Sequence, residues 1–469
     1  MPVPHRDIYL LSPKQFSPET IAVAFAKTSR APESFREIAS QLNDEKSAQF
    51  HEKWVVGYGH ASVAEHAVLH LAIENASRLA MEAIESNRLA SYTEKSTRYQ
   101  KWDSDNFYIP PELDGHSLRD EYIATCRMLF ETYAASLEPV RRVVAKDSPR
   151  RENETDEAWD RRIRSQYVDV CRFLLPAASL ANVGVTANGR VLENAIRKWS
   201  SSPLAEVREI GETVKIAARG EIPTLVKYAE PLSYLMETSA ELMVIASSAD
   251  TRKTPGDWCV LVDYDTDGER RILASALYRL GDMSYSEATR LVDSTGAARL
   301  AEVLLTRLGR YDIPLRELEH SSYTFDLLMD QGAYAEFKRH RMMTQTPQRL
   351  TCASGYAVPR RFAVAGIEDE YRRGMDAAAH FWQKMVAWNP DVAQYSVPNG
   401  FNRRVLASFN LREAYAFCQL RSAANAHFSI RRVAQRIAQE ISRVHPLLAG
   451  HMKLHNETWQ GIEAEYFLP

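Results

Sequence analysis

The chain has 469 residues, of which 45% are hydrophobic and 25% are charged, and its formal net charge at pH 7 is −3. This length exceeds what one ordinary hydrophobic core organises, so it predicts two domains of roughly 200 residues or more each. The near-neutral charge argues against nonspecific binding of a nucleic-acid polymer, which needs a basic surface. A small anionic ligand stays possible, because a few well-placed arginines are enough to hold a phosphate.

The five cysteines are scattered, with no Cys-x-x-Cys pair, so neither a disulfide framework nor a zinc knuckle is indicated. A reducing cytoplasm is the simplest compartment for such a chain. The N-terminal segment lacks the apolar core of a signal peptide, and no apolar run approaches the ~20 residues of a membrane-spanning helix. We therefore expect a cytoplasmic protein without a membrane anchor.

Most of the chain has apolar residues three and four positions apart, which predicts helices. We expect helices over residues 62–84, 118–145, 157–176, 191–199, 204–218, 286–308, 322–338, 366–388, 403–420 and 426–442, and a short strand over 259–264. The glycine-rich loop of a Rossmann or P-loop fold is missing. Polar residues near 229–258 predict a linker, and the charged stretch 146–162 predicts a solvated loop followed by the start of a helix.

Four sequence elements recur in the same order in both halves, which indicates an internal repeat. Each half has a Glu-His pair, a triplet after a predicted helix, an extended segment rich in Tyr, Val and Pro, and an Asn-x-Arg triplet. In the first half these lie at 65–66, 86–88, 107–110 and 188–190, and in the second half at 319–320, 339–341, 355–359 and 410–412.

The segment SYTEKSTRY at 91–99 carries Glu94, Ser96 and Arg98 at alternate positions. Alternate residues of an extended segment face the same side, so an acceptor, a hydroxyl and a guanidinium would converge on one ligand. This set suits a nucleotide monophosphate. A polar surface loop with a Glu–Arg pair is the alternative that the residue types leave open.

The triplet Arg339-His340-Arg341 places two guanidinium groups around an imidazole. It could hold a pyrophosphate or stabilise the negative charge of a reduced flavin. A solvated basic helix end is the plainer interpretation. His66 and His70 are four residues apart, but Glu65 is not placed as in a His-Glu-x-x-His motif, so we expect no metal site. The chain has no Gly-x-Ser-x-Gly motif of a serine hydrolase.

Taken together, these segments resemble the flavin-dependent thymidylate synthases, whose signature RHRxxSxNExSxRY follows a Gly-His…Glu-His segment. The first half has YGHASVAEH at 58–66, SNRLASYTEKSTRY at 86–99, NFYIP at 106–110, RFLLP at 172–176 and TANGR at 186–190. The second half has LEH at 318–320, FKRHRM at 337–342, SFNLREAY at 408–415 and LRSAANAHF at 420–428. The resemblance therefore covers most of both halves.

The departures from the family pattern are complementary. The first half keeps the nucleotide loop but has Ser86 and Asn87 where the family has Arg and His, whereas the second half keeps that triplet but has Pro347, Arg349 and Thr351 where Glu, Ser and Arg belong. Likewise, the first half keeps Arg172 where the second half has Gln394, and the second half keeps Arg421 where the first half has Trp199. We expect one kind of functional site, composed from both halves, with the reciprocal site degenerate. Two chains would then imitate the family's homotetramer.

The resemblance implies an α+β fold with antiparallel sheets, duplicated in tandem. The expected division is a domain at 1–230 with the nucleotide loop, a linker at 231–258 and a domain at 259–469 with the flavin motif. The implied activity is transfer of a one-carbon unit to C5 of a pyrimidine nucleotide, dUMP to dTMP, with FAD as cofactor and methylenetetrahydrofolate and NADPH as co-substrates. Another pyrimidine nucleotide, or a noncatalytic nucleotide- or flavin-binding role, are the alternatives.

The resemblance also implies residue roles. Arg421 would be catalytic by favouring the ionised uracil ring. The nucleotide would be held by Glu94, Ser96, Arg98 and Arg172. FAD would be bound by Ser62, Arg339, His340, Arg341, Asn410 and Arg412, together with Asn188 and Arg190 of the first half. No thiol nucleophile and no metal are required.

Overall fold

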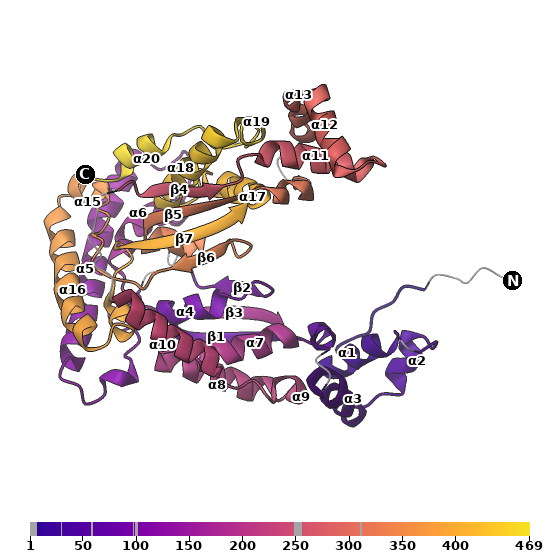
Figure 1. The fold of residues 1–469 in the computed structure, drawn as a ribbon. Helices are drawn as coiled ribbons and strands as arrows, with labels where there is room; N and C mark the ends of the chain where they lie inside the picture. Colours follow the sequence, from indigo (N-terminus) through magenta and orange to yellow (C-terminus); the bar gives the residue numbers. More distant parts are fainter. Residues whose placement is uncertain are drawn as a thin grey trace. The chain divides into compact units, whose positions relative to one another are not determined.

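The computed structural model describes residues 7–29, 31–57, 60–96, 98, 102–247, 256–309 and 312–469. The chain forms two compact units (Figure 1). Unit 1 comprises Met1–Lys95, Pro110–Asp114 and Leu180–Arg252, and unit 2 comprises Ser96–Ile109, Gly115–Ser179 and Lys253–Pro469. Unit 2 therefore combines a long segment of the first half of the sequence with nearly all of the second half.

Unit 1 packs helices around a three-stranded antiparallel sheet of order β1-β3-β2. Its strands are β1 (Val68–Ser77), β2 (Ser91–Glu94) and β3 (Leu180–Asn188), and its 3₁₀ helix η2 spans Ala61–His66. Its helices are α1 (Pro18–Lys27), α2 (Phe35–Ser40), α3 (Asp44–Phe50), α4 (Arg78–Glu85), α7 (Gly189–Ser200), α8 (Ala205–Ala218), α9 (Pro223–Val226) and α10 (Ser233–Ser247).

Unit 2 is larger and has a four-stranded antiparallel sheet of order β4-β5-β7-β6. Its strands are β4 (Cys259–Tyr264), β5 (Ser322–Asp330), β6 (Thr344–Pro347) and β7 (Asn402–Asn410). Its helices are α5 (Arg119–Asp147), α6 (Asp156–Cys171), α11 (Gly268–Leu280), α12 (Tyr285–Thr295), α13 (Ala297–Leu305), α14 (Gln331–Phe337), α15 (Arg360–Val364), α16 (Glu368–Trp388), α17 (Leu411–Arg421), α18 (Phe428–Val444), α19 (Pro446–Ala449) and α20 (Trp459–Tyr466). The predicted helix-rich fold with antiparallel sheets is confirmed.

The strand register repeats between the units. In unit 1, Ser91 of β2 lies opposite Thr186, two positions before Asn188, which ends β3. In unit 2, Thr344 of β6 lies opposite Ser408, two positions before Asn410, which ends β7. The equivalence of positions inferred from the sequence motifs is thus the equivalence of positions in the two sheets.

Three predicted helices were wrong in their first part, because each contains a strand that runs directly into a helix. The ranges 62–84, 322–338 and 403–420 hold β1, β5 and β7, followed by α4, α14 and α17. Side chains of β7 alternate between inward and outward positions, as in a sheet with one covered face. Leu, Ala and Phe occupy both the strand and the helix that follows, so the apolar run continues across the boundary and hides the change of period.

The other predicted elements fared better. Strand β4 has the predicted bounds, and α5, α6, α7, α8, α16 and α18 lie where helices were expected. The predicted helix over 286–308 is two helices, α12 and α13, separated at Gly296, whose φ of 92° suits glycine. Strand β3 was not predicted. Within the predicted linker the structure has α10, and the linker's residues 248–255 lie outside the described residues.

The helices that follow the equivalent strands β1 and β5 each begin with a hydroxyl–carboxylate pair, and the two partners are exchanged between the units. In unit 1, Ser77 caps α4, and its Oγ donates to Glu206 Oε2 at 2.6 Å. In unit 2, Asp330 caps α14 and accepts a hydrogen bond from the Ser429 hydroxyl. Glu206 and Ser429 are each the second residue of their helix, α8 and α18. Each unit thus has this pair, with the carboxylate at the opposite position.

Two equivalent segments pair with each other inside unit 2 and fix the first-half residues of the site. The segment that follows α6 donates from the Ala177 and Ala178 amides to the carbonyls of Val397 and Tyr395, at 2.9 and 2.8 Å. In return, the Gly400 amide donates to the Phe173 carbonyl at 2.9 Å. A Cβ at Gly400 would lie 2.7 Å from Tyr371 Oη, so glycine allows this close approach.

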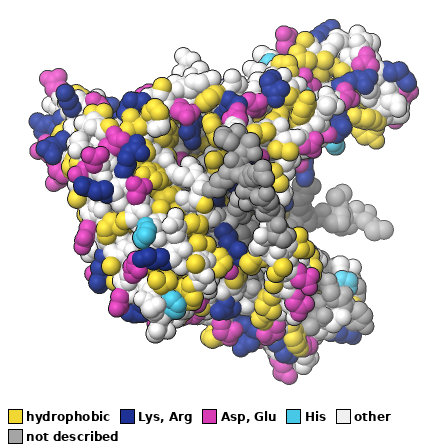
Figure 2. Space-filling view, turned by 60° about the vertical axis from the view of Figure 1, so that its left-hand side comes forward, with side chains coloured by type: hydrophobic (Ala, Val, Ile, Leu, Met, Phe, Trp, Pro, Cys, Tyr) yellow, Lys and Arg dark blue, Asp and Glu magenta, His cyan; other side chains and the backbone are white. Residues whose placement is uncertain are grey.

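Basic and acidic side chains are interspersed on the face shown in Figure 2, as the small net charge leads one to expect. None of the helices in the described part of the chain is long and apolar enough to span a bilayer.

Candidate functional site

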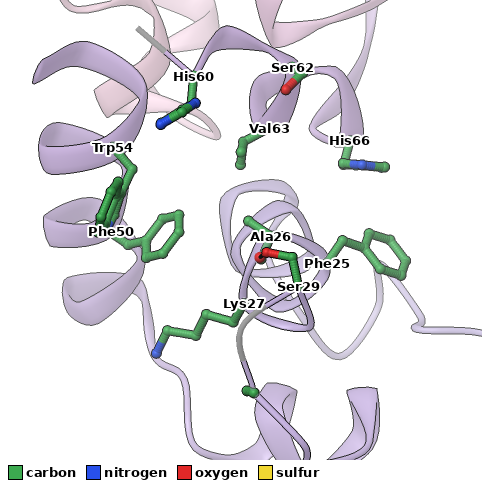
Figure 3. Close-up of a pocket in the computed structure, with 11 residues that line it drawn as sticks. Phe25, Ala26, Lys27, Ser29, Phe50, Trp54, His60, Ser62, Val63 and His66 are labelled. Carbon is green, nitrogen blue, oxygen red and sulfur yellow. Dashed lines mark hydrogen bonds between the residues drawn. The ribbon is translucent and has the colours of Figure 1, made fainter. Parts of the chain in front are cut away.

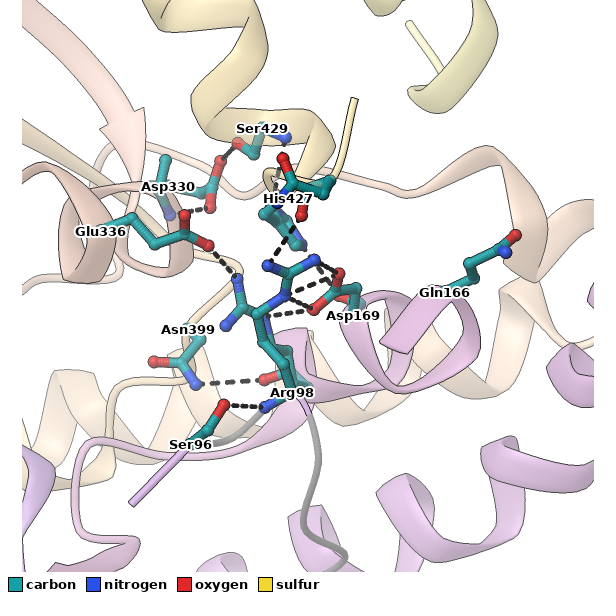
Figure 4. A network of polar contacts seen from close by, with 12 residues as sticks. Ser96, Arg98, Gln166, Asp169, Asp330, Glu336, Asn399, His427 and Ser429 are labelled. Atoms are coloured by element: carbon teal, nitrogen blue, oxygen red, sulfur yellow. Dashed lines mark hydrogen bonds and ion pairs between the residues drawn. The ribbon is translucent and has the colours of Figure 1, made fainter. Parts of the chain in front are cut away.

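Arg98 and Asp169 form the centre of a buried polar cluster in unit 2 (Figure 4). Arg98 donates from Nε and Nη2 to the Asp169 carboxylate at 2.9 and 2.7 Å, and from Nη1 to the Asn425 carbonyl at 3.1 Å. Ser96 Oγ accepts the Arg98 backbone N–H at 3.1 Å. Asp169 is buried on the last turn of α6, so this bidentate ion pair is largely shielded from solvent.

Arg172 extends the cluster from the first half of the sequence to the second. It lies in the 3₁₀ turn after α6, with Nε 3.6 Å from Asp169 Oδ1 and Nη2 3.5 Å from Glu336 Oε1. Its side chain is only 5% exposed. Glu336 comes from α14, so the two halves meet through Arg172.

Arg421, at the end of α17, continues the network. Its Nη1 donates to Glu336 Oε2 at 2.9 Å, and its Nε donates to His340 Nε2 at 3.0 Å. Because a guanidinium only donates, His340 Nε2 is the acceptor, and Nδ1 carries the proton that it donates to Glu413 Oε1 at 3.1 Å. Burial lowers the pKa of His340, although the hydrogen bond to Glu413 opposes this effect. The imidazole is thus neutral with a defined tautomer.

Burial also shifts the pKa of two further groups in the cluster. It raises the pKa of Asp169, against the effect of Arg172 and Arg98. It lowers the pKa of His427 well below the usual value, helped by the charges of Arg172 and Arg98. His427 Nδ1 accepts the Ser429 amide, so its Nε2 donates to the Asp169 carbonyl at 3.1 Å. His427 therefore holds the Asp169 backbone in place as a neutral donor.

The structure brings together most of the residues predicted for the nucleotide and the ionisation step. Ser96, Arg98, Arg172 and Arg421 all belong to this cluster of unit 2, and His340, which was predicted to bind FAD, belongs to it as well. Arg339 and Arg341 flank His340 in the turn after α14. Burial lowers the pKa of the Arg421 guanidinium, and the positive charge of Arg339 adds to this effect.

Glu94 is placed differently from the rest of the predicted nucleotide loop. It belongs to unit 1, where its Oε1 lies 2.8 Å from Nη1 of Arg78 and its side chain is 2% exposed. Strand β2 ends at Glu94, and Ser96 and Arg98 belong to unit 2. Thr97 and Tyr99 lie outside the described residues. The convergence of Glu94, Ser96 and Arg98 on one ligand stays a prediction.

The Asn-x-Arg triplets have the same local contacts in both units. Asn410 caps α17 by accepting the Glu413 amide at 2.9 Å, and Asn188 caps α7 by accepting the Val191 amide at 2.9 Å. The arginines pair with the glutamate of the repeated Glu-His motif: Arg412 with Glu319 at 2.8 Å, and Arg190 with Glu65 at 2.5 Å. These contacts give both motifs a structural role, in addition to the predicted binding of FAD.

Ser62 lies in unit 1, beside an aromatic pocket of about 470 Å³ (Figure 3). The pocket is lined by Phe25, Phe50, Trp54, His60, Ser62 and His66, among others. The ring centroids of Phe25 and His66 are 4.9 Å apart. Sequence reasoning singled out Ser62 but did not predict this pocket, because Phe25, Phe50 and Trp54 belong to no motif.

The residues present fit FAD by their chemistry. Arg339 and Arg341 supply guanidinium donors of the kind that hold a pyrophosphate or the anionic edge of a reduced flavin, and neutral His340 lies between them in the chain. Among the described residues, no group of three or more His, Cys, Asp or Glu side chains is placed to hold a metal ion.

Four residues of the cluster were missed by sequence reasoning: Asp169, Glu336, Glu413 and His427. Asp169 and Glu336 each precede a predicted arginine by three residues, which is a helical spacing, and that was the available signal. The repeat offers a second signal. Asp391 of the second half occupies the position that corresponds to Asp169 of the first half, and it forms an ion pair with Arg349 at 2.8 Å.

Unit 1 lacks the network around Arg421 as a whole. Glu336, His340, Glu413 and Arg421 correspond there to Ala83, Asn87, Val191 and Trp199. The Trp199 indole Nε1 donates to the Ala83 carbonyl at 3.0 Å, so the tryptophan fills the place of the ion pair. All four residues of this network are present in unit 2, and all four are replaced in unit 1.

Comparison with known proteins adds the following. Two regions of the chain, residues 12–224 and 260–447, match the family described as "Thymidylate synthase complementing protein". A "UPF0159 protein" of Chlamydia muridarum is 31% identical over 88% of this chain and 82% of its own length. A "Flavin-dependent thymidylate synthase" of Clostridium tetani is 27% identical over 46% of this chain and 83% of its own length.

One solved structure is that of a flavin-dependent thymidylate synthase from Helicobacter pylori, complexed with FAD and dUMP. It is 16% identical, with a TM-score of 0.31, over 42% of this chain and 99% of its own length. The relatives of single-domain length thus match about half of the chain, whereas the chlamydial protein matches most of it.

Proposed function

Because the chain belongs to the thymidylate synthase complementing protein family, we propose that it is a flavin-dependent enzyme that transfers a one-carbon unit to C5 of dUMP. The observation that carries this proposal is the cluster of unit 2, where Arg98, Arg172 and Arg421 meet around buried carboxylates. In this proposal Arg98 and Arg172, with the Ser96 hydroxyl, bind the nucleotide phosphate. The phosphate competes with Asp169 for the Arg98 guanidinium.

Arg421 has the chemistry and the setting for the activating step. Uracil C5 is a weak nucleophile, and a positive charge near N3 and O2 favours the ionised ring and raises the electron density at C5. Glu336 and neutral His340 hold the guanidinium by one hydrogen bond each. This preorientation reduces the rearrangement needed when the base binds.

The cysteines support a route without a protein nucleophile. Cys126 and Cys171 are buried, and burial raises the pKa of each thiol to about 12. Burial raises the pKa of Cys352 and Cys418 above its usual range as well. A thiol must be deprotonated to attack, so these groups are poor nucleophiles at neutral pH.

FAD, when bound, supplies the hydride for the reduction of the transferred carbon. Arg339, His340 and Arg341 would hold it, with Asn410, Arg412 and the unit 1 residues Ser62, Asn188 and Arg190 as further proposed contacts. Methylenetetrahydrofolate as carbon donor and NADPH as reductant belong to the same proposal, as does a dimer of two chains that imitates a tetramer of single domains.

The test is flavin content of the purified full chain, followed by dUMP titration while the flavin spectrum is recorded. We expect stoichiometric FAD, a spectral change with dUMP, and release of tritium from C5-labelled dUMP on turnover. Arg421→Leu should abolish tritium release and keep FAD bound. Arg349→Gln is the control, since Arg349 forms an ion pair with Asp391 in the same half of the sequence and lies outside the network around Arg421.

The outcomes separate the alternatives. Full tritium release by Arg421→Leu would remove Arg421 from the chemistry. Bound flavin that responds to UMP or dCMP, but not to dUMP, would keep the reaction class and change the substrate. A chain that takes up no flavin after reconstitution would refute the proposed activity and favour a noncatalytic nucleotide-binding role.

A further inference from the structure

One side of helix α17 holds the His340 imidazole at three points. Glu413, Phe417 and Arg421 follow one another at intervals of four residues, so they lie on the same side of the helix. Glu413 Oε1 accepts the Nδ1–H of His340 at 3.1 Å, and Arg421 Nε donates to the other ring nitrogen at 3.0 Å. Between them the Phe417 ring stands perpendicular to the imidazole, with the centroids 4.9 Å apart. The imidazole thus connects the first turn of α17 to its last residue.

The backbone of His340 is fixed independently of α17, by the turn that follows α14. Its amide donates to the Phe337 carbonyl at 3.0 Å, and its carbonyl accepts a hydrogen bond from the Gln345 side chain at 3.0 Å. The His340 side chain is only 9% exposed. What its neighbours on α17 still decide is the rotation of the ring and the nitrogen that carries the proton.

The three polar groups are satisfied by a single tautomer of the histidine. A carboxylate only accepts and a guanidinium only donates, so the proton belongs on Nδ1. A proton on Nε2 would face the Arg421 donor, and the Nδ1 lone pair would face the Glu413 carboxylate. Neutral histidine in water favours the proton on Nε2, so the less common tautomer needs an acceptor beside Nδ1. Glu413 supplies that acceptor.

The tautomer of His340 in turn affects how Arg421 is held. Arg421 Nε donates to His340 and Nη1 donates to Glu336 Oε2 at 2.9 Å. Within the described part of the chain, Nη2 donates no hydrogen bond. A planar guanidinium that is held at two nitrogens presents the third in one direction. In the proposed function, Nη2 is the group that remains for the uracil ring.

Unit 1 shows that the Glu413 carboxylate is not needed to form the helix. Its equivalent there is Val191, and helix α7 still begins with the same cap, in which Asn188 accepts the Val191 amide as Asn410 accepts the Glu413 amide. The carboxylate is present in the unit that has Arg421 and absent from the unit that does not. This distribution links Glu413 to the arginine and not to the fold of the repeat.

We propose that Glu413 is a positioning residue for the base-ionising step: it fixes the tautomer of His340, and His340 then fixes the direction in which Arg421 presents its guanidinium. The role of Arg421 rests on the proposed function, whereas the link from Glu413 to His340 does not. Both ring nitrogens of His340 are used within the protein, so its contact with FAD would be made by the ring carbons.

The tautomer is measured on the full chain with heavy nitrogen in its histidine rings. Long-range proton–nitrogen NMR spectra show which ring nitrogen carries the proton, and the signal lost in His340→Gln identifies His340 among the 13 histidines. In the unchanged chain we expect the proton on Nδ1. Glu413→Gln should keep it there, because the amide oxygen still accepts, whereas Glu413→Leu should move at least half of it to Nε2.

Rate and affinity are measured on the same variants. Glu413→Leu should slow tritium release at saturating dUMP at least tenfold and change the dissociation constant of dUMP less than threefold, because the phosphate is assigned to other arginines. Glu413→Gln should keep at least a third of the rate. Glu269→Leu is the matched control, because Glu269 also lies in the first turn of a unit 2 helix, where it accepts the Leu448 amide at 2.8 Å. It should leave both the tautomer and the rate unchanged.

Several outcomes would overturn the proposal. A proton on Nε2 in the unchanged chain would do so without any variant, and so would an unchanged tautomer in Glu413→Leu. A shifted tautomer with an unchanged rate would mean that His340 does not position Arg421. An equal loss of rate in Glu269→Leu would point to general damage of unit 2. If the unchanged chain releases no tritium, the proposed function fails, and the spectra, recorded without dUMP, still decide whether Glu413 sets the tautomer.

Discussion

Replacing Arg421 with methionine should destabilise unit 2 through the charges it leaves behind. The Arg421 and Glu336 side chains are 14% and 7% exposed, so the pair is shielded from water. Breaking a buried pair by removing one partner costs about 3–5 kcal/mol. Glu336 keeps Arg172 at 3.5 Å, so we expect the lower end, about 3 kcal/mol.

The second substitution Glu336→Gln should recover part of this loss, because it removes the stranded carboxylate and keeps its shape. We expect the two residues to be coupled by about 2–3 kcal/mol in a double-mutant cycle. The double variant should nevertheless stay inactive, since the positive charge that we assign to base ionisation is gone. The double variant would thus be more stable than the single variant Arg421→Met, although both would be inactive.

The assay must report on unit 2 by itself, because a chain with two units need not unfold in one step. Amide hydrogen exchange of peptides that cover α14 and α17, read by mass spectrometry across a urea series, gives the local free energy of opening. Coupling below ~0.5 kcal/mol would mean that the two substitutions act independently and would refute the buried-pair reasoning. Arg349→Met serves as a control, since its side chain is 36% exposed and its loss should cost less.

Three further predictions concern the cluster and the fold. Arg98→Gln should weaken dUMP binding by about 1.5–3 kcal/mol, roughly 10–100-fold, in calorimetric titration, whereas Arg349→Gln should leave it unchanged; equal losses would mean that the nucleotide site is wrongly assigned. Affinity for dUMP should rise as pH falls toward the raised pKa of Asp169, because protonation of this carboxyl releases Arg98 for the phosphate, and the trend should vanish in Asp169→Asn. A pH-independent affinity would contradict this competition. Asp330→Ser should lower the thermal midpoint, and adding Ser429→Glu should restore it by reproducing the exchanged pair of unit 1. If the double variant melts below the single one, the two pairs are not interchangeable.

How far the sequence alone reaches depends on the scale considered. Helices with several turns of their own, such as α5, α16 and α18, were predicted within a few residues, because 3.6-residue periodicity accumulates over length. Strands β1, β5 and β7 were absorbed into helices, because each enters a helix within one residue of its end. Capping residues Ser77, Asp330 and Asn410 mark those boundaries, and attention to them would have corrected the assignment.

For the site, the sequence identified the arginines and missed the carboxylates. Arg98, Arg172 and Arg421 stand in motifs whose losses are complementary between the halves, so the comparison of the two halves singles them out. Asp169, Glu336 and Glu413 lie on helices among other charged residues, where an acidic side chain is unremarkable. Only burial distinguishes them, and burial depends on which other segments pack against the helix.

The sequence by itself determined the repeat, the family and the set of arginines, because these follow from residue types at fixed spacing. The tertiary structure decided that residues 96–109 and 115–179 of the first half join the second half in unit 2. It also decided that Glu94 pairs with Arg78 and that His340 is neutral with its proton on Nδ1. The physical reason is that ion pairs, tautomers and pockets are set by neighbours outside the local segment, 16 residues away for Arg78 and Glu94 and 81 for His340 and Arg421, and local periodicity carries no information about them.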